Sequence, residues 1–140
     1  MNILFICRHN RFRSKVAEAF FNKYNKDRGN KVRSAGVMVD LLYEYSSSNI
    51  VKALEEKNAK VESEKSRQVD EYLLKWADKV IIVADNVNKN VFEGKDVEKW
   101  EVEDCSQEDM NGIRLRVDII EKKVKGLIKK LSRYKSLNNH

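Results

Sequence analysis

The sequence predicts an α/β fold, a three-layer sandwich in which a four-stranded parallel sheet carries helices on both faces. Short apolar runs, of the kind found in strands that are buried on both faces, alternate along the chain with longer segments of helical period. Neither a linker nor an internal repeat interrupts this alternation, and 140 residues is the length of one ordinary domain. We therefore expect residues 1–140 to form a single domain that binds its ligand at the carboxyl ends of the strands.

The first half of the chain contains two predicted strands and two predicted helices. Asn2–Cys7 is an almost continuous apolar run that predicts the first strand, and Lys31–Val37 predicts the second. A helix is expected between them, from Ser14 to a stop at Gly29. Its apolar stripe consists of Val16, Phe20 and Tyr24. The serines at 46–48 are expected to cap a second helix, whose apolar residues are Ile50, Val51 and Leu54.

The second half continues the alternation. Asp70–Asp78 predicts a short helix, Lys79–Ala84 a fully buried strand, and Val97–Val102 a weaker strand. Asp85 stands at the end of the buried strand, and we interpret it as a helix cap for the segment Val87–Phe92. The chain then forms a long final helix, with an apolar face made of Val117, Ile120, Val124, Leu127 and Leu131.

Composition restricts the class of protein. The hydrophobic fraction of 41% and the charged fraction of 36% indicate a globular chain with a strongly charged surface. No apolar run approaches the roughly 18 residues that span a bilayer, so we expect a cytoplasmic protein that does not bind membranes. The formal net charge of +6 favours anionic partners, but charge alone does not choose among phosphate esters, nucleic acid and an acidic membrane surface. The two cysteines, Cys7 and Cys105, are too few for a disulfide scaffold or a zinc site.

The segment from Cys7 to Ser14 is the strongest candidate for a chemical site. It places a thiol at the end of the first strand and, after five residues, Arg13 and Ser14 at the start of a helix. Backbone N–H groups of a loop that leads into a helix form an anion site together with the positive end of the helix dipole. Such a site holds a phosphoryl group and favours the thiolate form of Cys7, which is the nucleophilic form. The planar guanidinium of Arg13 is suited to bind two phosphoryl oxygens at once.

This arrangement of Cys7, five further residues and the pair Arg13-Ser14 after the first strand resembles the low-molecular-weight protein tyrosine phosphatase family, which shares its fold with one class of arsenate reductase. The resemblance spans most of the chain. The further matching segments are Ala17-Glu18-Ala19, Arg33-Ser34-Ala35-Gly36, Ser66-Arg67-Gln68-Val69 and Ala77-Asp78-Lys79-Val80-Ile81-Ile82-Val83. It implies a phosphomonoester hydrolase that uses no cofactor and no metal and forms a phosphocysteine on Cys7.

The resemblance also implies roles for individual residues. Asp104 matches the family's general acid, which protonates the leaving oxygen and then activates water. Asn10 would brace the loop in an unusual backbone conformation, and the Ser14 hydroxyl would hydrogen-bond the Cys7 thiolate. The implied catalytic residues are Cys7, Arg13 and Asp104, and the implied substrate-binding residues are Arg8, His9, Asn10, Arg11, Phe12 and Ser14. We interpret Arg8 and Arg11 as groups that steer anionic substrates.

Three departures from the family pattern affect the expected chemistry. His9 stands where the family usually has Gly, and Phe12 stands where many members have a second loop cysteine. Cys105 replaces the proline that follows the general acid. We interpret Cys105 either as a small apolar filler or as a thiol that captures an oxidised Cys7 in a disulfide.

The residues expected around the leaving group also differ from the family pattern. Ser106 and Gln107 occupy the places of tyrosines that often line the substrate cleft. Tyr43 or Tyr45 is expected to supply an aromatic wall instead. The expected partner is a phosphate monoester, either a phosphotyrosine protein or a small phosphoester, and we expect the protein to be a monomer.

Other functions fit the sequence less well. An arsenate reductase of this fold needs further cysteines near the third strand, and residues 83–89 contain none. A non-catalytic phospho-ligand or nucleic-acid binder needs neither Cys7 nor Asp104, and a phosphocysteine carrier does not need Asp104. Asp85 competes with Asp104 for the acid role by its position alone. A metal site formed by Cys7, His9, Cys105 and His140 would have to join distant segments.

Overall fold

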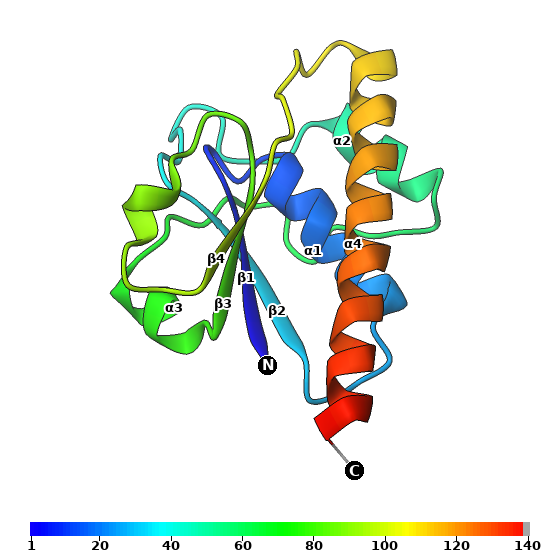
Figure 1. Ribbon diagram of the computed structural model, residues 1–140. Coiled ribbons are helices and arrows are strands. Elements are labelled where there is room, and N and C mark those ends of the chain that lie inside the picture. The colour runs from blue at the N-terminus through cyan, green and yellow to red at the C-terminus, as the bar shows by residue number, and fades with distance from the viewer. Residues whose placement is uncertain (139–140) are drawn as a thin grey trace.

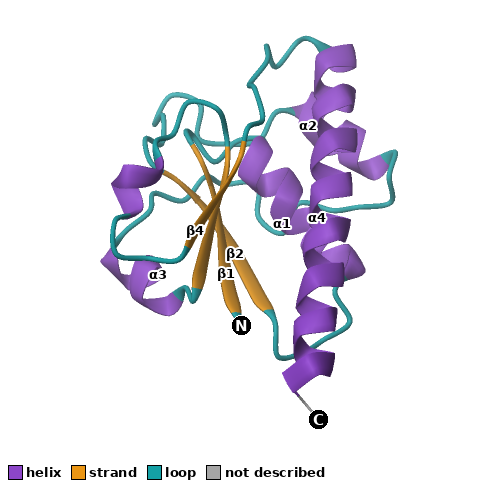
Figure 2. Ribbon diagram, in the orientation of Figure 1, coloured by secondary structure: helices purple, strands orange, loops and turns teal. Residues whose placement is uncertain are grey.

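The computed structural model describes residues 1–138 as an α/β sandwich (Figure 1). Figure 2 shows the strands at the centre with helices on both sides. The elements in chain order are β1 (Asn2–Cys7), α1 (Arg13–Tyr24), β2 (Lys31–Gly36), α2 (Ser48–Glu55), α3 (Glu71–Trp76), β3 (Lys79–Val83), η1 (Lys89–Phe92, a 3₁₀ helix), β4 (Val97–Trp100) and α4 (Met110–Asn138).

The four strands form one parallel sheet in the order β2-β1-β3-β4, which confirms the predicted fold class. The register pairs Cys7 with Gly36, and Val83 with Trp100, at the carboxyl ends of the strands. All four strands therefore end at the same edge of the sheet, opposite the N-terminus in Figure 1. The loops that follow β1, β2, β3 and β4 meet at this edge, which is where a parallel sheet of this kind binds ligands.

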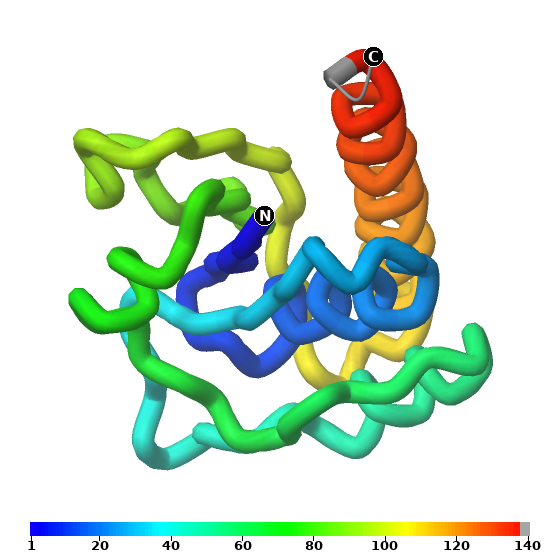
Figure 3. Tube along the Cα trace, turned by 90° about the horizontal axis from the view of Figure 1, so that it is seen from below, coloured from blue at the N-terminus to red at the C-terminus, as the bar shows by residue number. Residues whose placement is uncertain are grey.

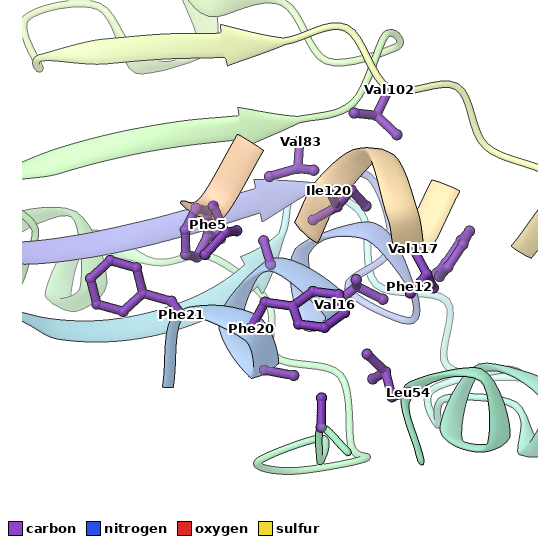
Figure 4. Packing of buried hydrophobic residues seen from close by; sticks show 14 of the residues in the cluster. Phe5, Phe12, Val16, Phe20, Phe21, Leu54, Val83, Val102, Val117 and Ile120 are labelled. Atoms are coloured by element: carbon purple, nitrogen blue, oxygen red, sulfur yellow. The ribbon is translucent and has the colours of Figure 1, made fainter. Parts of the chain in front are cut away.

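The strands are buried on both faces because alternate side chains belong to two hydrophobic clusters. Ile3 and Phe5 belong to the cluster beneath α1, α2 and α4, whereas Leu4 and Ile6 belong to the cluster beneath α3 and η1. Figure 4 shows side chains of the first cluster, among them Phe5 of β1, Phe20 of α1 and Ile120 of α4. Seen from below, α1 and α4 lie side by side on one side of the sheet (Figure 3).

Several helix boundaries depend on polar side chains. The predicted serine cap is confirmed, since the Ser47 hydroxyl accepts a hydrogen bond from the backbone N–H of Ile50 at the start of α2. The predicted stop of the first helix at Gly29 is wrong. Helix α1 ends at Tyr24 because the chain turns extended at Asn25, whose side-chain amide donates to the carbonyls of Asp27 and Asn30. Within residues 1–138, no helix combines the length and the apolar character that crossing a membrane requires.

Candidate active site

A small cavity of about 40 Å³ lies at the carboxyl edge of the sheet. Six of the sequence-predicted site residues line it, together with Gln107: Cys7, His9, Arg11, Phe12, Arg13 and Asp104. Arg8, Asn10 and Ser14, which were also predicted to bind substrate, are not among the lining residues. The structure thus brings residues 7–13 together with residues 104–107, which lie more than ninety positions away along the chain.

The thiol of Cys7 is buried and receives two polar contacts from its own loop. The Cys7 Sγ atom lies 3.0 Å from the Ser14 hydroxyl and accepts a hydrogen bond from the backbone N–H of Asn10 at 3.3 Å. The Ser14 oxygen accepts from the Asn10 side-chain amide at 2.7 Å, so its own proton is free to be donated to Cys7. The sulfur is thus contacted by a hydroxyl and a backbone N–H of its own loop.

Asn10 is the centre of the loop. Its φ of 55° places it in the left-handed region, as the resemblance implies. The Asn10 amide nitrogen donates to Ser14 and Ser34, and its carbonyl oxygen accepts from the backbone N–H of Arg67. The hydroxyl of Ser66 donates to the Asn10 backbone carbonyl at 2.9 Å. Every polar group of this buried residue is therefore paired, which fixes the strained conformation.

Arg13 is almost fully buried, with 2% of its surface exposed, and opens α1 toward the cavity. Its Nη1 atom donates to the Val102 carbonyl at 2.8 Å and to Asp85 Oδ1 at 3.2 Å, and its Nη2 atom donates to Asn86 Oδ1 at 3.2 Å. A guanidinium has five N–H donors, and these contacts with described residues use three of them. The remaining two, on Nε and Nη2, form the edge that binds an oxyanion bidentately.

Asp85 does not cap the segment that follows it, so that prediction is wrong. The cap of η1 is Asn88, whose side chain accepts a hydrogen bond from the backbone N–H of Asn90. Asp85 instead forms an ion pair with Arg13. The reason is positional, because Asp85 comes two residues after the end of β3 and already lies at the edge of the sheet where Arg13 is found.

Asp104 lies beside Arg13 and lines the same cavity, in the segment after β4. Its Oδ1 atom accepts the backbone N–H of Cys105 at 2.9 Å, and its Oδ2 atom lies 3.7 Å from Arg13 Nη2. The Asp104 side chain is 42% exposed, so a carboxyl group at the cavity mouth remains open to solvent. A proton donor at this point can reach an atom bound above Cys7.

Cys105 is a half-buried thiol directly after Asp104. Its side chain packs against the hydrophobic cluster beneath α1 and α4, whereas Cys7 belongs to the cluster on the other face. Burial raises the pKa of the Cys105 thiol above its ordinary value. Both observations favour the interpretation of Cys105 as an apolar filler. His140, named in the disfavoured metal site, lies outside the described residues.

The N-terminus of α1 is built to attract an anion. Among the described residues, the residue before the helix, Phe12, makes no side-chain capping hydrogen bond, and the first turn contains no acidic residue. The first backbone N–H groups of α1 and the positive end of its dipole are therefore available to a ligand.

Three side chains of the loop hold the segment that follows β2. His9 Nδ1 lies 2.6 Å from the Met38 carbonyl, and the Arg8 guanidinium contacts the Met38 sulfur. Arg11 donates to the Tyr45 carbonyl at 2.9 Å and lies over the ring of Tyr43, 5.4 Å from its centre. The two tyrosines predicted as an aromatic wall thus adjoin the cavity through Arg11 and do not line it.

Two buried charges lie behind the loop. Ser34, which accepts from Asn10, donates its own proton to Glu18 at 2.8 Å. Burial raises the pKa of Glu18, and the hydrogen bond from Ser34 opposes this effect. Burial also lowers the pKa of Lys15, whose ammonium donates to the Lys65 carbonyl. The polar chain from Cys7 therefore ends in a carboxyl group that the protein interior disfavours in its charged form.

Gly36 is a functional position to which the sequence analysis gave no role, although it lies in a segment that carried the resemblance. A Cβ atom there would lie 2.8 Å from the backbone carbon of His9 and 2.9 Å from both the Arg8 carbonyl and the Asn10 nitrogen. Only glycine permits this close approach of β2 to the loop. The same segment, Arg33-Ser34-Ala35-Gly36, also contains Ser34. Its match to the family pointed to both residues but did not indicate which atoms they contact.

A buried thiol in an anion-binding loop, at the carboxyl edge of a parallel α/β sheet, defines a phosphatase-like domain. The family model described as low molecular weight phosphotyrosine protein phosphatase matches residues 2–137. The chain belongs to this family, which confirms the resemblance inferred from the sequence. None of the curated proteins compared with the chain matches it.

Solved structures with this fold have several activities. An arsenate reductase from Archaeoglobus fulgidus is 31% identical, with 91% of this chain and 98% of that chain covered and a TM-score of 0.77. A low molecular weight protein tyrosine phosphatase from T. tengcongensis is 24% identical, with 93% and 99% covered and a TM-score of 0.80. An arginine phosphatase from Geobacillus stearothermophilus is 22% identical, with 99% and 97% covered and a TM-score of 0.80. The last two likenesses are evidence of the fold alone.

Proposed function

We propose that the protein hydrolyses phosphate monoesters through a phosphocysteine intermediate. The observation that carries this proposal is the cavity shared by Cys7, Arg13 and Asp104, in which Ser14 and Asn10 donate to the sulfur. The three groups supply what the reaction needs, namely a nucleophile, an oxyanion clamp and a proton donor.

In the first half-reaction, the Cys7 thiolate attacks phosphorus and the bond from phosphorus to the ester oxygen breaks. Asp104 gives its proton to the departing oxygen, which leaves as an alcohol or phenol. Arg13 holds two of the equatorial phosphoryl oxygens, and the N–H groups of the loop and of α1 hold the charge that develops on them. Asp85 and the Val102 carbonyl keep the guanidinium in the plane that this contact requires.

In the second half-reaction, the Asp104 carboxylate takes a proton from a water molecule that attacks phosphorus. The bond from sulfur to phosphorus breaks, its electron pair returns to Cys7, and inorganic phosphate leaves. Ser14 stabilises the thiolate as a leaving group by the same hydrogen bond that stabilises it as a nucleophile.

The deciding experiment is the hydrolysis of para-nitrophenyl phosphate in the presence of a metal chelator. We expect turnover by the wild type and none by Cys7→Ser. The matched control is Cys105→Ser, which removes the other thiol and leaves the cavity untouched, and which we expect to turn over normally. Turnover that needs added metal, or that survives in Cys7→Ser, would contradict the proposal.

Arsenate reduction is a second candidate, favoured by the 31% identity to the reductase from Archaeoglobus fulgidus. It requires a second thiol that forms a disulfide with Cys7 as arsenate is reduced to arsenite. Cys105 and Cys7 belong to hydrophobic clusters on different faces of the sheet, which counts against a relay within this chain. Loss of free thiol on incubation with arsenate would favour this candidate.

Other properties expected from the sequence stay predictions. These are the single domain of residues 1–140, the monomeric state, the cytoplasmic location and a phosphotyrosine protein as substrate. Leu41, Leu42, Tyr43 and Tyr45 are exposed in the segment after β2, and Arg11, which lines the cavity, contacts Tyr43 and Tyr45. Exposed apolar side chains of this kind support a protein substrate.

A further inference from the structure

Gln107 has a buried polar atom that no described residue satisfies. Within residues 1–138, its Oε1 atom is the one buried side-chain nitrogen or oxygen without a hydrogen-bond partner. Leaving such an acceptor unpaired costs about 1–3 kcal/mol. An unpaired acceptor that persists in a cavity beside a nucleophile points to a partner that arrives during the reaction.

The position of Gln107 is fixed by its backbone. The Asn49 side-chain amide, in α2, donates to the Gln107 carbonyl at 3.0 Å. Two hydrogen bonds also hold the turn that contains Gln107. The Ser106 hydroxyl accepts from the backbone N–H of Glu108, and the Ser106 carbonyl accepts from the backbone N–H of Asp109. The side chain therefore enters the cavity from a rigid support, three residues after Asp104.

We propose that Gln107 orients the water that hydrolyses the phosphocysteine, an inference that rests on the proposed function. In the first half-reaction, an ester oxygen carries no hydrogen, so the leaving atom offers Gln107 Oε1 nothing to accept. The attacking water enters from the side on which the leaving group departed and carries two hydrogens. Asp104 takes one of them as a proton, and the second needs an acceptor inside the cavity.

Gln107 Oε1 supplies that acceptor. With one hydrogen bonded to Asp104 and the other to Gln107, the lone pair of the water oxygen is directed at phosphorus. The bond from oxygen to phosphorus forms as the bond from sulfur to phosphorus breaks and its electron pair returns to Cys7. The hydrogen held by Gln107 stays on the product as a P–OH group. The contact exists only in the second half-reaction, so it accelerates that step selectively.

Rapid-quench kinetics with para-nitrophenyl phosphate tests this assignment. In Gln107→Met, which preserves side-chain volume and removes the amide, we expect kcat to fall about tenfold to hundredfold. We expect kcat/KM, which reports the first half-reaction, to fall much less. A burst of about one equivalent of nitrophenol per enzyme should precede slow turnover, and acid-quenched protein should carry phosphate on Cys7. Because dephosphorylation then limits turnover, kcat should be the same for aryl esters with different leaving groups.

Two further variants isolate the acceptor. Gln107→Glu keeps an acceptor and removes the donor of the side chain, so its ratio of kcat to kcat/KM should stay nearer the wild type than that of Gln107→Met. Ser106→Ala is the matched control in the same turn, and we expect no burst from it. Thermal unfolding of each variant checks that all compared proteins are folded.

Other outcomes overturn the inference. A loss of kcat/KM that varies with the leaving group, without a burst, would mean that Gln107 binds the leaving group. Wild-type kinetics in Gln107→Met would mean that it has no role. The proposed function fails separately if the wild type does not hydrolyse para-nitrophenyl phosphate without added metal, or if hydrolysis survives in Cys7→Ser. Either result would remove the basis of the inference as well.

Discussion

Arg13 and Asp85 form an ion pair of 3.2 Å between residues 72 positions apart in sequence. The guanidinium is buried, and the carboxylate is 43% exposed at the cavity edge. A buried cation needs a partner, and Asp85 provides one that also sets the plane of the guanidinium. Asp85 and Asp104 thus lie on two sides of the same arginine, and their contributions can be separated experimentally.

Asp85→Asn should weaken phosphoryl binding in every step. The amide keeps the shape of the carboxylate but removes the charge that holds Arg13. We expect kcat/KM to fall about tenfold to hundredfold, and inhibition by inorganic phosphate to weaken in parallel. The loss should be equal for good and poor leaving groups, and a leaving-group dependence would assign the acid role to Asp85.

Asp104→Asn should lower activity by an amount that depends on the leaving group of the ester. We expect turnover of alkyl esters to fall by about 10²–10⁴, because a poor leaving group must be protonated as it departs. Activated aryl esters should lose less. Steady-state assays with a graded series of phenols test this expectation, and equal losses across the series would count against Asp104 as the acid.

Gly36→Ala should disrupt the loop without touching a reactive group. The added methyl would overlap three backbone atoms of residues 8–10, which cannot move aside as a side chain can. We expect about a hundredfold loss of kcat/KM and a free energy of unfolding lower by about 1–3 kcal/mol. Gly126→Ala is the control, since no described atom outside the neighbouring backbone of α4 lies within 4 Å of its Cβ position. It should keep full activity and gain about 0.5–1 kcal/mol of stability from its place in α4. A fully active Gly36→Ala enzyme would contradict the close packing of β2 on the loop.

Glu18→Gln should change how stability depends on pH. The pKa of Glu18 is raised in the folded protein, so its contribution to stability is fully present below the pKa of the unfolded chain. That contribution is lost as pH rises through the folded-state pKa. Glutamine carries no charge and can still accept from Ser34, so the variant should gain stability relative to wild type between pH 4 and pH 8. Denaturant unfolding at several pH values measures this difference. A constant difference would contradict the effect, and Glu64→Gln, at an exposed position, serves as control.

Cys105 should remain a thiol while Cys7 is oxidised. Its raised pKa and its packing against the core make it a poor nucleophile at neutral pH, and its reaction with iodoacetamide should accelerate only as pH rises. After peroxide treatment, mass spectrometry under non-reducing conditions should find oxygen added to Cys7 and no linkage between the two cysteines. A disulfide between Cys7 and Cys105 would restore the redox interpretation.

The parts of the fold that could be predicted from the sequence are those determined by residues close to one another along the chain. Two-sided burial of β1 and β3 follows from unbroken apolar runs, and the cap at Ser47 follows from its side chain. The predicted end of α1 was wrong because the helix ends where the Asn25 side chain donates to the carbonyls of Asp27 and Asn30. The identity of one residue does not predict such a set of hydrogen bonds. Periodicity predicts elements well and their ends poorly.

In the candidate site, too, the features that could be predicted are those formed by residues that are neighbours in sequence. The spacing of Cys7 and Arg13 was sufficient to predict that the two residues lie close together, because loop and helix are adjacent in sequence. The partners of Arg13 were not predictable, since Asp85 and Val102 reach it only through the order of strands in the sheet. The unpaired oxygen of Gln107 could not be predicted at all, because it depends on what the folded cavity fails to provide.

The pairing of Asn10 has a consequence for biosynthesis. Cys7 is synthesised before the residues that shape its loop, because Asn10 adopts its left-handed conformation against Arg67, 57 residues later, and Arg13 is held by Val102, 89 residues later. Contacts of such long range form late in folding. The nascent thiol therefore behaves as an unactivated cysteine while most of the chain is being made. Under the proposed function, an activated thiol exists only after the sheet has closed, so activity would report the completion of folding.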